Sequence, residues 1–139
     1  MLANKETVHK LIPQKYPMAM VDGLFDHDKN SSVSRLIIES DNIFCNDGLF
    51  TEAGIIENIA QTAALHDAWH SFKNNTKSNI GFIGALKRIK IHKLPKVNES
   101  LRTRIEILNN LMSVSIIKGE VYSDNQLIAE GEMNIFLQD

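Results

Sequence analysis

The stretch NIFCNDGLFTEAGIIENIAQTAALHDAWHSFKN, residues 42–74, decides how the rest of this chain is interpreted. A polar, glycine-containing approach leads into one long helical pattern over residues 52–73. Thr51 is a plausible N-cap, and the acidic Glu52 in the first turn suits the positive end of the helix dipole. Apolar residues cover well over half of the helix circumference, which predicts that the helix is buried on most of its sides.

The remaining elements are predicted as one short helix and six strands. Residues 4–11 form the short helix, which Pro13 ends, because proline disfavours the helical conformation in the residue before it. Strand-like runs are predicted at residues 18–27, 32–40, 78–91, 99–108, 112–122 and 126–137. Short turn-forming connectors such as Asn109-Asn110 predict antiparallel neighbours. This order predicts an α+β domain, with the long helix packed on an antiparallel sheet.

Length and composition exclude several classes of protein. The chain has 139 residues, 43% of them apolar and 23% charged, so we expect one globular domain over residues 1–139. The net charge of −2 gives no reason to expect nucleic acid as a partner. The single cysteine, Cys45, excludes an internal disulfide. No signal-peptide pattern and no membrane-spanning run is present, so we expect a cytoplasmic protein.

Four segments carry a family likeness. They are LIPQKYPMAMVD (11–22), IIENIAQTAA (55–64), GALKRIKIHKLPKVNESLRTRIEI (84–107) and LIAEGEMNIFL (127–137). In this order and spacing they resemble the hotdog-fold 3-hydroxyacyl-[acyl carrier protein] dehydratases. The closest likeness is to the divergent subgroup found with aryl-polyene or flexirubin-type pigment synthesis. The resemblance implies a hotdog fold, in which a curved antiparallel sheet wraps the long helix. It also implies that two protomers pair edge to edge, with acyl tunnels at the dimer interface.

The resemblance also implies a site. Dehydration of a 3-hydroxyacyl thioester needs a base at C2, an acid for the leaving hydroxyl and N–H groups for the thioester carbonyl. By its place in the motif, Glu57 is the acid, and an apolar surrounding favours its protonated form. Gln61, one turn further on the same face, is expected to orient it. Gly54, in the first helical turn with its free N–H groups, and Phe50 are predicted to bind substrate.

The alternative for Glu57 is a buried acid that is paired at a subunit interface. The chain also departs from the family pattern in the loop before the long helix. The family places its catalytic histidine there, followed by phenylalanine and then Pro-Gly, whereas this loop has neither histidine nor proline. Gln14 replaces the histidine of the family's early PHRYP-like segment. Asp47 and Glu52 are nearby acids. Glu52 is a possible substitute base or a first-turn dipole partner.

Two other features of the long helix and its approach have residue types that occur in metal sites and nucleophilic catalysis. His66 and His70 have the spacing of metal ligands on one helix face, but no third ligand is evident, so no metal is predicted. We expect them near the exposed end of the helix, with Trp69 packing inward. Cys45 has no adjacent histidine and is not expected to be a nucleophile.

A basic run follows the long helix. Lys87, Arg88, Lys90 and Lys93 are predicted either to dock the acidic helix of an acyl carrier protein or to form a solvated strand face. No cofactor is predicted beyond the phosphopantetheine that carries the substrate.

The sequence therefore predicts a 3-hydroxyacyl-[acyl carrier protein] dehydratase-like protein of fatty acid or aryl-polyene type synthesis. Its partners would be an acyl carrier protein and either a second copy of the chain or another hotdog subunit. Two alternatives stay open. One is a catalytically silent hotdog subunit that supports an active dehydratase, and the other is an acyl-thioester hydrolase.

Overall fold

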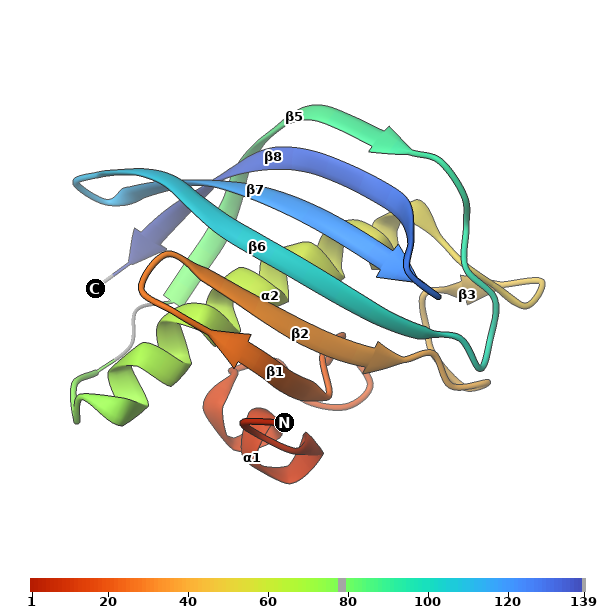
Figure 1. Cartoon of the computed structure of the whole chain (residues 1–139), viewed down its shortest axis with the longest axis horizontal. Coiled ribbons are helices and arrows are strands. Elements are labelled where there is room, and N and C mark those ends of the chain that lie inside the picture. Colours follow the sequence, from red (N-terminus) through yellow and green to blue (C-terminus); the bar gives the residue numbers. More distant parts are fainter. Residues whose placement is uncertain (78–79, 139) are drawn as a thin grey trace.

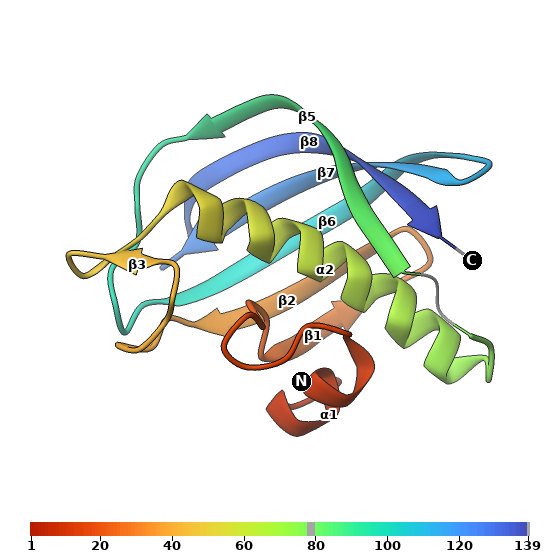
Figure 2. The ribbon, with the colours of Figure 1, turned by 180° about the vertical axis from the view of Figure 1, so that it is seen from behind.

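In the computed structural model, which describes residues 1–77 and 80–138, a curved antiparallel sheet wraps one long helix (Figure 1). Seen from behind, the long helix runs along the concave face of the sheet (Figure 2). The short N-terminal helix lies beside the C-terminal half of the long helix. The predicted α+β architecture is confirmed. Within the described residues, no helix is long and apolar enough to cross a bilayer.

The elements follow the predicted order with shifted boundaries. The helices are α1 (Lys5–Leu11) and α2 (Glu52–Lys73). The strands are β1 (Gly23–His27), β2 (Ser31–Ile37), β3 (Cys45–Asn46), β4 (Leu49–Phe50), β5 (Ile80–Ile91), β6 (Ser100–Leu111), β7 (Val114–Ser123) and β8 (Gln126–Gln138). The main sheet has the order β1-β2-β6-β7-β8-β5, so β5 lies at one edge beside β8, and β3 and β4 form a separate hairpin.

Two apolar clusters hold α2 in place. In the larger one, Ile55 and Ile59 of α2 pack against the inward side chains of the sheet, such as Ile105 and Ile117. Strand β7 comes so close to the helix that a Cβ on Gly119 would lie 2.5 Å from Ile59. The smaller cluster joins α1 to the last turns of α2 through Val8, Ile12, Leu65 and Trp69. Burial of these side chains is the main favourable contribution to this packing.

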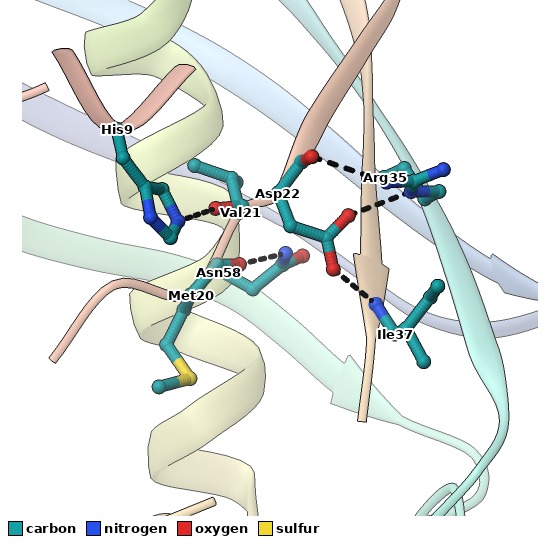
Figure 3. A network of polar contacts seen from close by, with 7 residues as sticks. All are labelled: His9, Met20, Val21, Asp22, Arg35, Ile37 and Asn58. Carbon is teal, nitrogen blue, oxygen red and sulfur yellow. Dashed lines mark hydrogen bonds and ion pairs between the residues drawn. The ribbon is translucent and has the colours of Figure 1, made fainter. Parts of the chain in front are cut away.

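The segment before β1 is where the sequence prediction was wrong. A strand was predicted over residues 18–27, but residues 18–22 lie outside β1 because side chains of α2 take their hydrogen bonds. The N–H of Met20 donates to Oε1 of Gln61 over 2.6 Å, and its carbonyl accepts from Nδ2 of Asn58 over 2.8 Å (Figure 3). The carbonyl of Met18 accepts from Nε2 of Gln61 over 2.9 Å. Side chains distant in sequence replace a strand partner here.

Asp22 attaches the end of this segment to the sheet (Figure 3). Its Oδ1 lies 2.6 Å from Nε of Arg35, and its Oδ2 accepts from the N–H of Ile37 over 2.8 Å. Nε2 of His9 lies 3.2 Å from the carbonyl of Val21, which ties α1 to the same segment. Residues 18–22 are therefore held by both helices and by β2.

Two further boundaries differ from the prediction. Asn109-Asn110, expected as a turn, lies inside β6, and the turn falls at Met112-Ser113. The β3–β4 hairpin was missed because strands of two residues carry no periodicity. Its signal was the Asp47-Gly48 pair, whose φ values of 51° and 78° suit a tight hairpin turn.

Asn58 provides a test of this packing. It is fully buried, and its Oδ1 accepts from Oγ1 of Thr103 over 2.5 Å while its Nδ2 holds Met20. Asn58→Ala leaves both partners buried and unpaired, so we expect the free energy of unfolding to fall by about 2–4 kcal/mol in urea denaturation. The exposed Asn109→Ala is the control and should stay within about 0.5 kcal/mol of the wild type. If the free energy of unfolding falls equally in the two variants, the anchoring role of Asn58 is contradicted.

Candidate functional site

A cavity of about 770 Å³ lies between α2 and the β5 half of the sheet. On its helix wall the small residues Ala60, Ala63 and Ala64 leave space where larger side chains would fill it, and Glu57, His66 and Asp67 add polar groups. The sheet wall is mainly apolar, with Asn110 and Ser115 as polar members, and its apolar residues are Phe82, Ile83, Ile105, Ile107, Ile117, Ile135 and Leu137. This volume and lining are typical of a site for an apolar organic ligand.

Glu57 brings a carboxyl group to the wall of this cavity. Nε2 of Gln61, one turn further along α2, donates to Oε2 of Glu57 over 2.7 Å. That bond makes Oε2 an acceptor, so Oε1 is the oxygen left for a proton or a ligand. Gln61 is itself only 1% exposed, and its amide is used by Glu57, Met18 and Met20. Gln61 therefore positions Glu57 and does not line the cavity.

Gln14 lies on the same cavity wall, together with Pro13. Its loop is held next to Gln61, because Nε2 of Gln61 donates to the carbonyl of Met18 over 2.9 Å, and the N–H of Met18 donates to the carbonyl of Lys15 over 2.7 Å. Oε1 of Gln14 is buried and has no hydrogen-bond partner. In the sequence Gln14 stands out only as a replacement for the family's histidine. Nothing in its local pattern indicates that it lines the same cavity as Glu57.

His66 lies at the far end of the cavity and was misplaced by the sequence prediction. It is 5% exposed, not near an exposed end, while Trp69 packs inward as predicted. Oγ of Ser32 lies 2.6 Å from its Nδ1 and 2.9 Å from Nδ1 of His27. Burial, followed by the neighbouring His27, lowers the pKa of His66 to about 4. Near neutral pH the His66 ring is therefore uncharged.

His66 is also remote from Glu57. The two residues are nine positions apart, which is about 14 Å along a helix. Nδ1 of His66 is hydrogen-bonded to Oγ of Ser32, and the ring also forms a hydrogen bond with the backbone of Lys29. His66 is the only histidine among the described residues that line the cavity. It is not placed to remove a proton from a group held by Glu57.

Phe50 and Gly54, the predicted substrate-binding residues, pack against each other. Phe50 is completely buried, and a Cβ on Gly54 would lie 2.6 Å from its ring and 2.8 Å from Cβ of Phe44. Neither residue is among those that line the cavity. Glycine is needed here because the helix begins in close contact with the Phe50 ring and the Phe44 side chain. A substrate-binding role for Gly54 rests on the backbone N–H groups of the first turn alone.

The other candidates lie outside the cavity wall. Glu52 is exposed in the first turn of α2, and Asp47 is exposed in the β3–β4 turn. Burial raises the pKa of the Cys45 thiol, which reduces its reactivity as a nucleophile. Among the residues that the structure describes, no cluster of three or more His, Cys, Asp or Glu side chains could hold a metal ion.

The basic run lies on the edge strand β5 and its exit. The predicted docking residues are all exposed: Lys87, Arg88, Lys90 and Lys93. Lys87 and Lys90 stand opposite Glu132 and Glu130 of β8, and Arg88 forms a 2.8 Å ion pair with Glu132. Opposite charges on neighbouring strands attract each other and stabilise the sheet. The run is therefore balanced by acids that are distant in sequence, and its local charge is smaller than the sequence indicates.

A family model described as ApeP-like, ApeP dehydratase, matches residues 6–139. The chain belongs to the ApeP-like dehydratase family. Curated relatives of this ApeP-like protein carry the name 3-hydroxyacyl-[acyl-carrier-protein] dehydratase FabZ. The protein from Campylobacter fetus is 23% identical, with 95% of each chain covered. The protein from Oceanobacillus iheyensis is 26% identical, with 96% of this chain and 97% of the relative covered.

Solved structures show the same fold. The dehydratase heterocomplex ApeI:P from Xenorhabdus doucetiae matches with a TM-score of 0.86 and 15% identity, covering 95% of this chain and 91% of that one. A homologue of HP0420 from Helicobacter felis matches with a TM-score of 0.70 and 16% identity, covering 99% and 93%. The ApeP-like chain therefore has the predicted hotdog fold, with α2 as its central helix.

The buried histidine predicts a specific pH dependence of stability. The pKa of His66 is about 4 in the folded protein and near 6.5 when unfolded, so the unfolded chain binds more protons between these values. We expect the free energy of unfolding to fall as the pH decreases from 6.5 to 4. His66→Asn should show a shallower fall over this window in urea titrations at fixed pH. An unchanged pH dependence in His66→Asn would contradict this assignment.

Proposed function

We propose that this ApeP-like protein is the acid-bearing subunit of a 3-hydroxyacyl-[acyl carrier protein] dehydratase. Glu57 and the cavity belong to this chain, and a second hotdog subunit supplies the base. The observation that carries the proposal is the Glu57 carboxyl group, held by Gln61 at the wall of an apolar cavity. A carboxyl group beside an apolar cavity of this size is suited to an acyl chain that carries a hydroxyl group.

The chemistry follows from the oxygen that Gln61 leaves free. A protonated Glu57 donates its Oε1 proton to the 3-hydroxyl, and the C3–O bond breaks to release water. A base takes the C2 proton, and the electrons of the C2–H bond form the C2=C3 double bond of the enoyl thioester. Proton exchange with solvent then restores both groups. General acid and base groups of this kind each contribute about 10²–10⁴-fold to a rate.

The second subunit is proposed because the described lining of the cavity offers no base close to Glu57. Asp67 also lines the cavity, but it lies ten positions further along α2, about 15 Å along the helix. Among the other described lining residues, His66 is remote and engaged, and Gln14 has no basic nitrogen. The match to one chain of a dehydratase heterocomplex supports a hotdog partner for this chain. A base from another subunit would complete the site without any residue of the loop before α2. Fatty acid and aryl-polyene type synthesis are the two pathways in which we expect this reaction.

Two other functions remain outcomes of the test. A silent subunit would support an active partner without using Glu57. An acyl-thioester hydrolase would use Glu57 to activate a water and would release a free acid. The three functions differ in product and in their dependence on Glu57, so one assay separates them.

The assay uses a 3-hydroxyacyl-carrier protein, incubated with this protein, with a histidine-bearing hotdog subunit, and with both. We expect rapid formation of the enoyl thioester only with both subunits, and Glu57→Gln should lower that rate by about 100-fold or more. Glu52→Gln, an exposed acid one turn earlier on the same helix, is the matched control and should keep the rate.

Three results would contradict the proposal. Full activity of the mixture with Glu57→Gln would favour a silent subunit. Enoyl product from the single chain would place the base within it. Free acid as the main product would indicate a hydrolase.

Docking of the carrier protein at Lys87, Arg88, Lys90 and Lys93 is part of the same proposal. Because Glu130 and Glu132 balance this run, we expect a modest contribution. Combined Lys87→Glu and Lys90→Glu should raise the KM for carrier-bound substrate by about threefold to tenfold at low salt. The KM for a pantetheine-bound substrate should not change.

Lys118→Glu is the control for charge on the same sheet, since Lys118 is exposed on β7 opposite Glu132. If charge reversal at Lys87 and Lys90 leaves the KM for the carrier-bound substrate unchanged, the carrier protein docks elsewhere.

A further inference from the structure

The cavity extends far beyond Glu57 along α2. Ala64 and Asp67 also line it, and they follow Glu57 by seven and ten positions, which puts all three near one face of the helix. Along the helix axis, Ala64 is therefore about 10 Å from Glu57, and Asp67 is about 15 Å from it. The cavity has the length needed for an extended ligand, with Glu57 as the first residue of α2 on its wall.

The sheet accompanies the helix over the same length. Oγ of Ser34 lies 2.7 Å from Oγ1 of Thr62, and Ser32 is hydrogen-bonded to His66, so β2 runs in the direction opposite to α2. Strand β7 has the direction of β2, because both strands pair antiparallel with β6. Going back along β7 therefore follows α2 toward its C-terminal end and leads to Ser115, which lines the cavity. Helix and sheet together bound the cavity along this length.

The wall between Glu57 and the far end is apolar. From residue 58 to residue 65, the described residues of α2 that line the cavity are alanines, and Ile107 and Ile117 line it from the sheet. The pantetheine arm of a carrier-bound substrate contains amide groups, which an apolar wall would leave without hydrogen bonds. The acyl chain has no such groups, so this part of the cavity suits the chain and not the arm.

Ala64 differs from the other two alanines of this wall. Ala60 and Ala63 also pack against the larger apolar cluster, whereas Ala64 is in neither apolar cluster of the described residues. Its methyl group therefore borders the cavity without contributing to the core. Side chains of a helix lean toward its N-terminus, so a larger side chain at position 64 would project into the cavity toward Glu57.

We propose that Ala64 is a specificity-determining residue, which keeps open the part of the cavity that selects long 3-hydroxyacyl chains over short ones. A chain whose hydroxyl group lies at Glu57 must extend about 10 Å further to pass Ala64. Every methylene group that enters this apolar part leaves water and favours binding. A short chain ends before Ala64 and leaves the apolar wall hydrated. This inference rests on the proposed function, which places the acyl chain in the cavity.

The test measures the binding of 3-hydroxyhexanoyl-pantetheine and 3-hydroxydecanoyl-pantetheine to the full chain by calorimetry. We expect the wild type to bind the longer probe about 10-fold to 100-fold more tightly, because more methylene groups are buried. Ala64→Leu should lower the affinity for the longer probe by about tenfold or more and keep the affinity for the shorter one. Ala64→Val, a smaller obstruction, should have an intermediate effect. Ala53→Leu, at an exposed alanine of the same helix, is the matched control and should bind both probes like the wild type.

Stability separates this role from a structural one. A side chain that fills empty space should leave the free energy of unfolding of Ala64→Leu unchanged or higher in urea denaturation. A lower stability together with an equal loss of affinity for both probes would make Ala64 a structural residue and overturn the inference.

The inference and the proposed function fail in different ways. If the wild type binds both probes equally, or if both Ala64 variants keep its preference, the inference alone is overturned, and the enoyl assay with Glu57→Gln still tests the proposed function. If the wild type binds neither probe, both are overturned.

Discussion

The side-chain amide of Gln61 is the contact on which the arrangement of the site depends. It donates to Glu57 and to the carbonyl of Met18, and it accepts from the N–H of Met20. Gln61 is buried, and its bond to Met20 is buried as well, so losing the amide would leave the N–H of Met20 unpaired in the interior. One side chain therefore sets the direction of the carboxyl and the course of the loop that carries Gln14.

The helix that carries Gln61 meets three kinds of surroundings. Asn58 and Gln61 satisfy the backbone of residues 18–20, and Asn58 also accepts a hydrogen bond from Thr103 of β6. Ile55 and Ile59 pack in the apolar core against the sheet. The small residues Ala60, Ala63 and Ala64 border the cavity. The helix thus has three different environments, which is consistent with its lack of a simple apolar stripe.

Local sequence patterns predicted the elements whose partners lie close by and failed where a distant side chain decided the outcome. The first five residues of the strand predicted over residues 18–27 are not part of β1, because Asn58 and Gln61 bond to their backbone groups. His66 was expected near an exposed end, but it is buried beside Ser32 and His27. The basic run on β5 meets its acidic partners only through the register with β8.

The sequence by itself determined the long helix, the antiparallel sheet, the place of Glu57 and the absence of a histidine before the helix. These follow from periodicity, turn residues and motif position, all of which are local. Only the tertiary structure decided that Gln14 shares a cavity with Glu57 and that Phe50 is enclosed against Gly54. Those outcomes depend on side-chain packing and hydrogen bonds between segments far apart in the chain, which no local pattern specifies.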